Sequence, residues 1–377
     1  MWRRVPMMVI ISTDEFRYSA ASSSRAWHIS RALNEHGIKT VIVARRANSD
    51  GIAGENIITV KPLIGEGFVG NLLFVFQISV TVIRILANTK LKKIIARGYS
   101  LALLFSLLKL WRVEILYDFH GYAYKEQMVE GRMFRARFTR VFDWLSLKLA
   151  DQIITIREEL REDFPLDVQQ KTILLPNGVD IEEFAFAGDS SILAKYSIPH
   201  DKKLVGFIGN WEAWITIEDI LESAKYFGDE YEIVIIGRGK WFEEYKNSYT
   251  SIIFTGNISH RDAIGLLKKI DVCVCPYSTH VIAKKRQYQK VLDYLAAGKP
   301  IVISDADSRE KFLKDGENVL MYRAGDPKDL AAKVKTILNN DELRKKMSRN
   351  NLELAKQFTW KKVIARSGIN NILQGVA

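Results

Sequence analysis

The sequence predicts a two-domain α/β protein in which each domain is built on a doubly wound parallel sheet. Its 377 residues exceed what one hydrophobic core usually serves. Short apolar, β-branched runs alternate with longer amphipathic segments in both halves, and glycines or polar turns follow many of these runs. This alternation predicts parallel strands with helices on both faces of each sheet. Ligands on such sheets bind beyond the carboxyl ends of the strands, so the loops there are candidate sites.

The first half alternates strands and helices from its start. The expected strands are Met8–Ile11, Thr40–Val43, Lys93–Ala96, Ile115–Tyr117 and Gln152–Thr155. The expected helices are Ser24–Glu35, Asn71–Ala87, Leu101–Leu110 and Lys125–Leu149. Gly37 follows the first helix, where a glycine can adopt the left-handed capping conformation.

The second half repeats the pattern and ends in helices. The expected strands are Leu204–Ile208, Glu232–Ile236, Ile252–Phe254, Val272–Val274 and Ile301–Ile303. The expected helices are Ile217–Tyr226, Trp241–Lys246, Arg261–Lys269 and Gln287–Ala297. The tail is expected to form helices at Asp326–Leu338 and Asp341–Lys356, with a last helix from Phe358 to about Leu373.

Composition and charge are those of a globular protein with anionic partners. The chain is 47% hydrophobic and 26% charged, and its formal net charge of +11 favours a membrane surface, nucleic acid or phosphorylated substrates. No nucleic-acid reader motif accompanies the charge, so nucleic acid is the least favoured of these partners. Cys273 and Cys275 alternate on an expected strand and point to opposite faces, which predicts reduced thiols and a cytoplasmic location.

Two apolar segments are candidates for a signal peptide or a membrane span. Met7–Ile11 is followed at once by acidic residues, which indicates a first strand rather than a signal peptide. Phe68–Ile83 is short for a membrane span and is expected to be a buried helix.

The segment 124–149 mixes basic and aromatic side chains along one expected helix. These are Arg132, Arg135, Arg137, Arg140 and Lys148, with Met133, Phe134, Phe138, Phe142 and Trp144. Aromatic rings and cations on one helix suit the interface of an anionic membrane, which would make the protein peripheral on the inner face of the cell membrane. The alternative is a core-packing helix whose cationic face is solvated.

Two loops of the first half lie where a ligand is expected. Ser22, Ser23 and Ser24 end a run of small residues after the first strand, which would let backbone amides approach an anion ahead of a helix; a plain loop is the alternative. His120, in Asp118–Gly121, follows a strand and precedes a glycine turn, where it would reach a cleft or serve only structure.

Three loops of the second half follow neighbouring strands of one sheet. They are Gly209-Asn210, Gly237-Arg238-Gly239 and Gly256-Asn257, and together they predict a nucleotide-sized site with exposed amides. On the expected helix ahead of Ile301, Lys290 and Asp293 project from the same side. They could meet a phosphate and a sugar hydroxyl, or form an exposed ion pair.

Two motifs resemble those of family 4 glycosyltransferases, which are retaining enzymes of the GT-B type. The helix with K-V-L-D-Y-L-A-A-G-K-P at 290–300 is similar to their donor-site helix, and P-N-G-V-D-x-x-x-F at 176–184 is similar to their interdomain crossover. The resemblance implies two Rossmann-like domains facing each other across a cleft. The acceptor domain would be 1–178, with a C-terminal helix at 358–377 packing back on it, and the donor domain would be 179–357.

The same resemblance implies residue roles. Asp293 would hold the ribose hydroxyls, Lys290 and Arg238 the diphosphate, and the backbone of Ile258 the base. His120 would touch the sugar near the anomeric carbon. The chain departs from the family pattern in two places: Lys285 stands where many relatives have the first of two glutamates, and the loop 210–216 lacks the usual cation. Arg238 with Lys240, or the run 284–286, would then supply the charge.

The resemblance implies a retaining hexosyltransferase that uses a UDP- or GDP-sugar and needs no metal or other cofactor. The basic aromatic helix suggests a lipid-linked or envelope glycan as the acceptor. Two alternatives remain open. One is a GT-B nucleotide-sugar epimerase, for which a convincing set of carboxylates is lacking; the other is a non-catalytic homologue that binds nucleotide and membrane.

Overall fold

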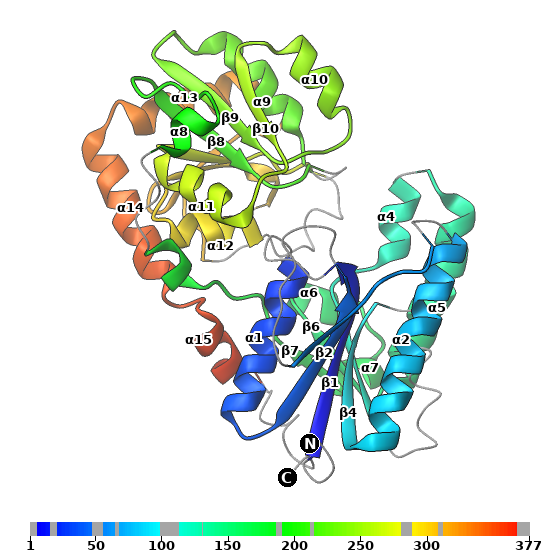
Figure 1. The fold of residues 1–377 in the computed structure, drawn as a ribbon. Coiled ribbons are helices and arrows are strands. Elements are labelled where there is room, and N and C mark those ends of the chain that lie inside the picture. Colours follow the sequence, from blue (N-terminus) through cyan, green and yellow to red (C-terminus); the bar gives the residue numbers. More distant parts are fainter. Residues whose placement is uncertain are drawn as a thin grey trace. The chain divides into compact units, whose positions relative to one another are not determined.

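The structure is a computed structural model that describes residues 6–15, 21–46, 56–64, 68–98, 113–129, 131–185, 191–211, 215–279, 289–307 and 312–367. The chain divides into two compact units. Unit 1 comprises Met1–Asn177 and Trp360–Ala377, and unit 2 comprises Gly178–Thr359. Each unit has its own parallel sheet (Figure 1). The prediction of two parallel-sheet α/β domains is therefore confirmed.

Unit 1 contains a seven-stranded parallel sheet with the order β3-β2-β1-β4-β5-β6-β7. Its strands are β1 (Pro6–Glu15), β2 (Lys39–Arg45), β3 (Ile57–Val60), β4 (Lys90–Arg97), β5 (Glu114–Phe119), β6 (Gln152–Thr155) and β7 (Thr172–Leu174). The order reverses between β1 and β4, and ligands of doubly wound sheets bind at the carboxyl ends of the strands beside such a switch point.

Helices cover both faces of the unit 1 sheet. They are α1 (Ala21–Glu35), α2 (Phe68–Asn88), α4 (Ala123–Val129), α5 (Met133–Leu149), α6 (Glu158–Arg161), α7 (Leu166–Gln170) and α15 (Trp360–Arg366). Because strand residues alternate, Met8 and Ile10 pack in a core with α1 and α15, whereas Val9 and Ile11 pack with α2 and α5. Figure 1 shows α1 on one side of β1 and α2 with α5 on the other.

Unit 2 contains a six-stranded parallel sheet with the order β10-β9-β8-β11-β12-β13. Its strands are β8 (Lys203–Ile208), β9 (Tyr231–Ile236), β10 (Ile252–Gly256), β11 (Val272–Cys275), β12 (Ile301–Ser304) and β13 (Val319–Tyr322). Its helices are α8 (Ile192–Lys195), α9 (Ile217–Ser223), α10 (Phe242–Ser248), α11 (His260–Lys269), α12 (Gln289–Ala296), α13 (Pro327–Leu338) and α14 (Asp341–Ala355). Short 3₁₀ turns add η2 (Ile181–Phe184), η3 (Ala224–Tyr226) and η5 (Asp305–Asp307). The switch point lies between β8 and β11.

The single helix expected at Lys125–Leu149 is wrong. The chain forms α4 and α5 instead, and Gly131 between them has φ +77°, a left-handed conformation that ends α4. The short edge strands β3, β7 and β13 were not predicted. The helix expected at Leu101–Leu110 lies outside the described residues, as does the end of the last helix.

Candidate functional site

In unit 1, His120 is part of a buried ion-pair network. His120 lies at the carboxyl end of β5, and its Nε2 is 2.9 Å from Oδ2 of Asp118. The guanidinium of Arg25, on α1, donates to the same carboxylate at 2.9 to 3.3 Å. The Arg25 side chain is 1% exposed. Its Nη1 also donates to the carbonyls of Leu175 and Pro176 and to Oδ1 of Asn177.

The charges of this network fix the state of the His120 imidazole. Burial opposes ionisation of Asp118, but Arg25 and His120 outweigh it and hold the pKa of that carboxyl well below its usual range. Burial, with the cations of Arg97 and Arg25, lowers the pKa of His120 to about 4, although Asp118 raises it. At neutral pH the imidazole is uncharged. Its Nε2–H donates to the ionised Asp118, so Nδ1 is the nitrogen left as a hydrogen-bond acceptor.

Sequence reasoning found His120 but missed Arg25. The signal was present, because Arg25 is four residues ahead of Ile29 and eight ahead of Leu33, both buried on α1. A cation on the apolar face of a helix needs a buried anionic partner.

The serines Ser22, Ser23 and Ser24 do not precede the first helix as expected. The helix α1 begins at Ala21, so all three belong to its first turns. Serine and alanine tolerate the helical backbone well enough to extend it beyond the apolar pattern that starts at Ala26.

In unit 2, the glycine loops after β8, β9 and β10 are bonded to one another. Gly209 N–H donates to the carbonyl of Ile236 at 2.8 Å, and Gly237 N–H donates to the carbonyl of Gly256 at 3.0 Å. Gly209 and Gly237 have φ of +117° and +124°. A Cβ on Gly237 would lie 2.5 Å from the carbonyl oxygen of Gly209. Glycine is therefore required for this close approach of the two loops.

Lys290, on α12, brings a cation to the first of these loops. Its Nζ is 4.2 Å from the ring centroid of Phe207 in β8. Its Cε lies 3.3 Å from the place where a Cβ on Gly209 would stand. The amides of Gly209 and Gly237 are bonded to backbone carbonyls rather than exposed as expected, but an ammonium beside a turn without side chains is still suited to a phosphate group. Lys290 thus lies beside the glycine loops, and its charge also acts on the Asp293 carboxylate.

Asp293, one turn after Gln289 on α12, is bonded to Gln289 and lies within electrostatic range of charged groups from three elements. The Nε2 of Gln289 donates to Oδ1 of Asp293 at 3.1 Å. His260 begins α11, and its Nε2 lies 3.0 Å from Oε2 of Glu183 in η2. Burial raises the pKa of Asp293 to about 6, while Gln289, His260 and Lys290 counteract part of this rise. Glu183 raises it further. Sequence reasoning named Asp293 but missed Gln289, His260 and Glu183.

The remaining predicted donor residues differ in how they are placed. Arg238 is bonded to Glu243 at 2.8 Å through Nη2, and its backbone N–H faces Oδ1 of Asn210 at 3.4 Å. Ile258 follows β10 and packs its half-buried side chain on the unit 2 core. Lys285 and the run 284–286 lie outside the described residues, as does the centre of the 210–216 loop.

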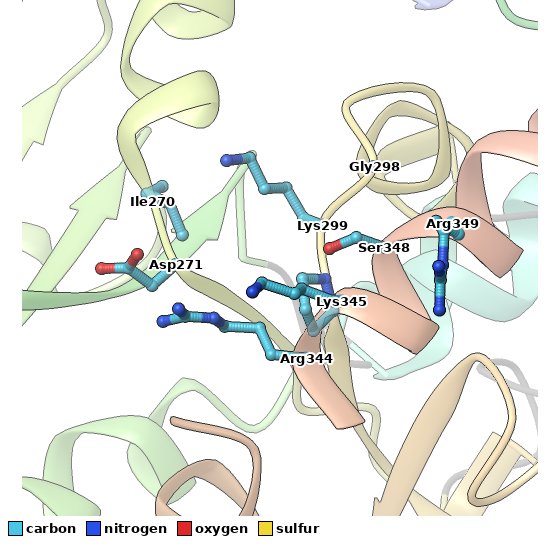
Figure 2. A pocket seen from close by; sticks show the side chains of 9 residues that line it. Ile270, Asp271, Gly298, Lys299, Arg344, Lys345, Ser348 and Arg349 are labelled. Atoms are coloured by element: carbon cyan, nitrogen blue, oxygen red, sulfur yellow. The ribbon is translucent and has the colours of Figure 1, made fainter. Parts of the chain in front are cut away.

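A separate cavity of about 410 Å³ in unit 2 lies away from this edge. Asp271 immediately precedes β11 and Lys299 precedes β12, so the cavity is at the amino ends of the strands. Figure 2 shows both side chains near Arg344 and Lys345 of α14. Lys299 donates to the carbonyl of Lys268 at 2.8 Å, and burial lowers its pKa. This cavity does not contain the glycine loops, Lys290 or Asp293.

Comparison with known families decides what the two units are. Residues 22–183 match the family profile described as Glycosyltransferase Family 4. Residues 189–353 match the profile described as Glycosyl transferases group 1. The chain belongs to glycosyltransferase family 4. The first match covers most of unit 1 and ends at residue 183, just inside unit 2, and the second lies within unit 2.

Curated relatives of this glycosyltransferase match it at low identity. An uncharacterized glycosyltransferase of Methanocaldococcus jannaschii is 26% identical over 308 residues, which are 77% of this chain and 73% of the relative. A phosphatidyl-myo-inositol mannosyltransferase of Mycobacterium leprae is 27% identical over 212 residues, 54% of this chain and 53% of the relative. A second M. jannaschii glycosyltransferase is also matched over only 57% of its length. The chain thus matches about half the length of several relatives.

Solved structures match over nearly the whole chain. The sucrose-phosphate synthase of Thermosynechococcus elongatus has a TM-score of 0.78 at 15% identity and covers 98% of both chains. HepE of Anabaena, in a complex with UDP-glucose, has a TM-score of 0.71 at 13% identity and covers 97% of this chain and 99% of that chain. At these identities the likeness establishes the fold, which is GT-B.

Proposed function

We propose that this glycosyltransferase is a retaining hexosyltransferase that moves a sugar from a UDP- or GDP-sugar to a hydroxyl of a lipid-linked or envelope glycan at a membrane surface. The observation that carries the donor half of the proposal is the edge of unit 2. There the glycine loops after β8, β9 and β10 are bonded to one another and the Lys290 ammonium lies beside them. Asp293 follows Lys290 on α12, and the charge of Lys290 acts on its carboxylate. The complex of HepE with UDP-glucose supports a nucleotide-sugar donor on this fold.

The proposed roles follow from the chemistry of these groups. Asp293 would accept hydrogen bonds from the ribose hydroxyls, and Lys290 would neutralise the diphosphate. In the transfer, the bond from the anomeric carbon to the diphosphate oxygen breaks and a bond to the acceptor oxygen forms on the same face. The acceptor proton passes to the departing phosphate. Charge stabilisation and positioning would supply most of the rate, and we expect no bound metal.

The contacts that Arg238 and His120 already make limit the roles that we propose for them. Arg238 is paired with Glu243, so it would have to exchange that partner for the diphosphate. The neutral His120 would offer Nδ1 to a sugar hydroxyl, since its Nε2 is committed to Asp118.

Thermal unfolding with nucleotides tests the donor proposal. We expect UDP or GDP, at 100 times its dissociation constant, to stabilise the protein by about 2.7 kcal/mol. The same nucleotide should give no shift with Asp293→Ala. If UDP, GDP and ADP all leave the wild-type midpoint unchanged, the donor proposal is wrong.

The acceptor half of the proposal rests on the side chains of α5. Apart from Leu147, the residues that the helix buries are small or polar, namely Ala136, Thr139, Asp143 and Ser146. It exposes its large apolar ones, including Phe134 at 77%, Trp144 at 55% and Phe138. Exposed arginines at 132, 135, 137 and 140 accompany them. A helix that packs on a core would bury its large apolar side chains, whereas α5 exposes most of them. This pattern favours the membrane interpretation over a core-packing helix. Among the helices that the structure describes, none has the length and apolar character to cross a bilayer.

Co-sedimentation with vesicles tests the membrane proposal. At low salt we expect binding to vesicles that contain anionic lipid and little binding to neutral ones. The double variant Phe134→Ala/Phe138→Ala should bind markedly less. Leu352→Ala, which truncates an exposed apolar residue of unit 2, is the matched control and should bind as the wild type does. Equal binding by the double variant would refute a role for α5.

A further inference from the structure

Gln289 connects the Asp293 carboxylate to the start of unit 2. Its Nε2 donates one hydrogen to Oδ1 of Asp293 at 3.1 Å and lies 3.2 Å from the carbonyl oxygen of Gly178. A side-chain amide nitrogen has two hydrogens, so these two acceptors use both. Gly178 belongs to the crossover segment, defined here as residues 175–184, which leads from unit 1 into unit 2.

We propose that Gln289 is a positioning residue for donor binding, which holds the Asp293 carboxylate in place by tying it to the Gly178 carbonyl. The proposal rests on the proposed function, because it assumes that Asp293 binds the ribose. The spacing supports it: residues four apart on a helix lie on the same face, so Gln289 can reach Asp293 without distorting α12.

A second contact joins the same segment to the same site. Glu183, five residues after Gly178, is bonded to His260 at the start of α11. Asp293 and Glu183 both raise the pKa of His260, which places its charge near the Asp293 carboxylate. The groups that act on Asp293 are therefore Gln289 and Lys290 from α12, His260 from α11 and Glu183 from η2.

The preceding residues of the crossover segment are bound in the same way within unit 1. Arg25 donates to the carbonyls of Leu175 and Pro176 and to the Asn177 side chain, and it also holds Asp118 against His120. Residues 175 to 177 are thus bonded to Arg25, which positions His120 in unit 1. The next residue, Gly178, is bonded to Gln289, which positions Asp293 in unit 2. The crossover segment therefore connects the two units along the chain and also supplies the carbonyl that binds Gln289.

Titration calorimetry of the full chain with UDP and GDP, from pH 5.5 to 8.5, tests the proposal. Wild-type affinity should rise with pH, with a midpoint near the Asp293 pKa of about 6, because the ionised carboxylate is the better acceptor. Gln289→Ala removes a donor to that carboxylate. We expect it to weaken binding about tenfold and to move the midpoint upward by about one pH unit. Gln289→Glu keeps the shape but adds a like charge, and should move the midpoint further.

Gln169→Ala is the matched control. Gln169 also donates to backbone carbonyls, but in unit 1, so its loss should leave the pH midpoint unchanged. A midpoint that stays in place in both Gln289 variants overturns the proposal and leaves the proposed function intact. An equal shift in Gln169→Ala also overturns it, because the effect would then be general. Absence of any nucleotide binding by the wild type would refute the proposed function itself, and this proposal with it.

Discussion

At the scale of single residues, the unit 1 site depends on a cation buried within the protein. Arg25 is almost fully buried, and its guanidinium binds a carboxylate and three groups of the crossover segment. Removing one partner of a buried ion pair leaves the other charge without compensation, which costs far more than the loss of an exposed pair. The network is therefore a strong constraint on the position of His120.

We expect Arg25→Met to lower the free energy of unfolding by about 3–5 kcal/mol, because Asp118 would be left buried without its cation. Urea denaturation at pH 7 measures this. Arg31→Met is the control on the same helix: its ion pair with Glu35 is exposed on both sides, so the change should cost less than about 1 kcal/mol. Similar losses in the two variants would contradict the interpretation.

Whereas Arg25 stabilises the fold, the ionised carboxylate of Asp293 destabilises it. Its pKa in the folded protein, about 6, is above the unfolded value of 3.8, so the native state binds more protons between these values. Stability should therefore fall as pH rises from about 4 through 6. Asp293→Asn removes this cost, and we expect it to stabilise the protein by up to about 3 kcal/mol at pH 7. The gain should vanish below pH 4 in a series of urea titrations. A variant that is less stable than the wild type at pH 7 would contradict the prediction.

At the scale of elements, the sequence predicted the helices and strands that a local pattern of apolar residues indicates. The strand β6 and the cap at Gly37, with φ +80°, were found because apolar runs and glycine signals are local. The break between α4 and α5 was missed because Arg132 and Met133 continue a helical composition across Gly131. Arg25 and Gln289 were missed because their importance depends on partners brought close by the fold. Lys285, which was predicted from a motif, lies outside the described residues.

The glycine loops give a prediction at this scale. Gly237→Ala places a Cβ 2.5 Å from the Gly209 carbonyl oxygen and forces the loops after β8 and β9 apart. We expect loss of nucleotide stabilisation in thermal unfolding, together with a lower midpoint. Gly316→Ala is the control: it has φ +75° but open space around it, so only the backbone strain of about 1 kcal/mol applies. Retention of full nucleotide stabilisation by Gly237→Ala would be inconsistent with a role for this loop pair.

At the scale of the whole molecule, the two units have separate hydrophobic cores and separate site residues. One core is confined to unit 2, and two lie on the faces of the unit 1 sheet. Under the proposed function, the groups that would bind the donor lie in unit 2, and His120 and α5 lie in unit 1. A ligand that binds one unit should therefore slow the hydrogen exchange of that unit before it affects the other.

Hydrogen exchange with and without nucleotide measures this division. At 100 times its dissociation constant, a ligand that binds only folded unit 2 slows exchange through its global opening about 100-fold. We expect UDP or GDP to protect peptides that cover β8, β9, β10 and α12, and to leave those of β5 and α5 unchanged. Asp293→Ala should show no protection, which excludes a nonspecific effect. Protection that starts in β5 at low nucleotide concentration would place the primary donor contacts in unit 1, and the assignment of the two units would have to be reversed.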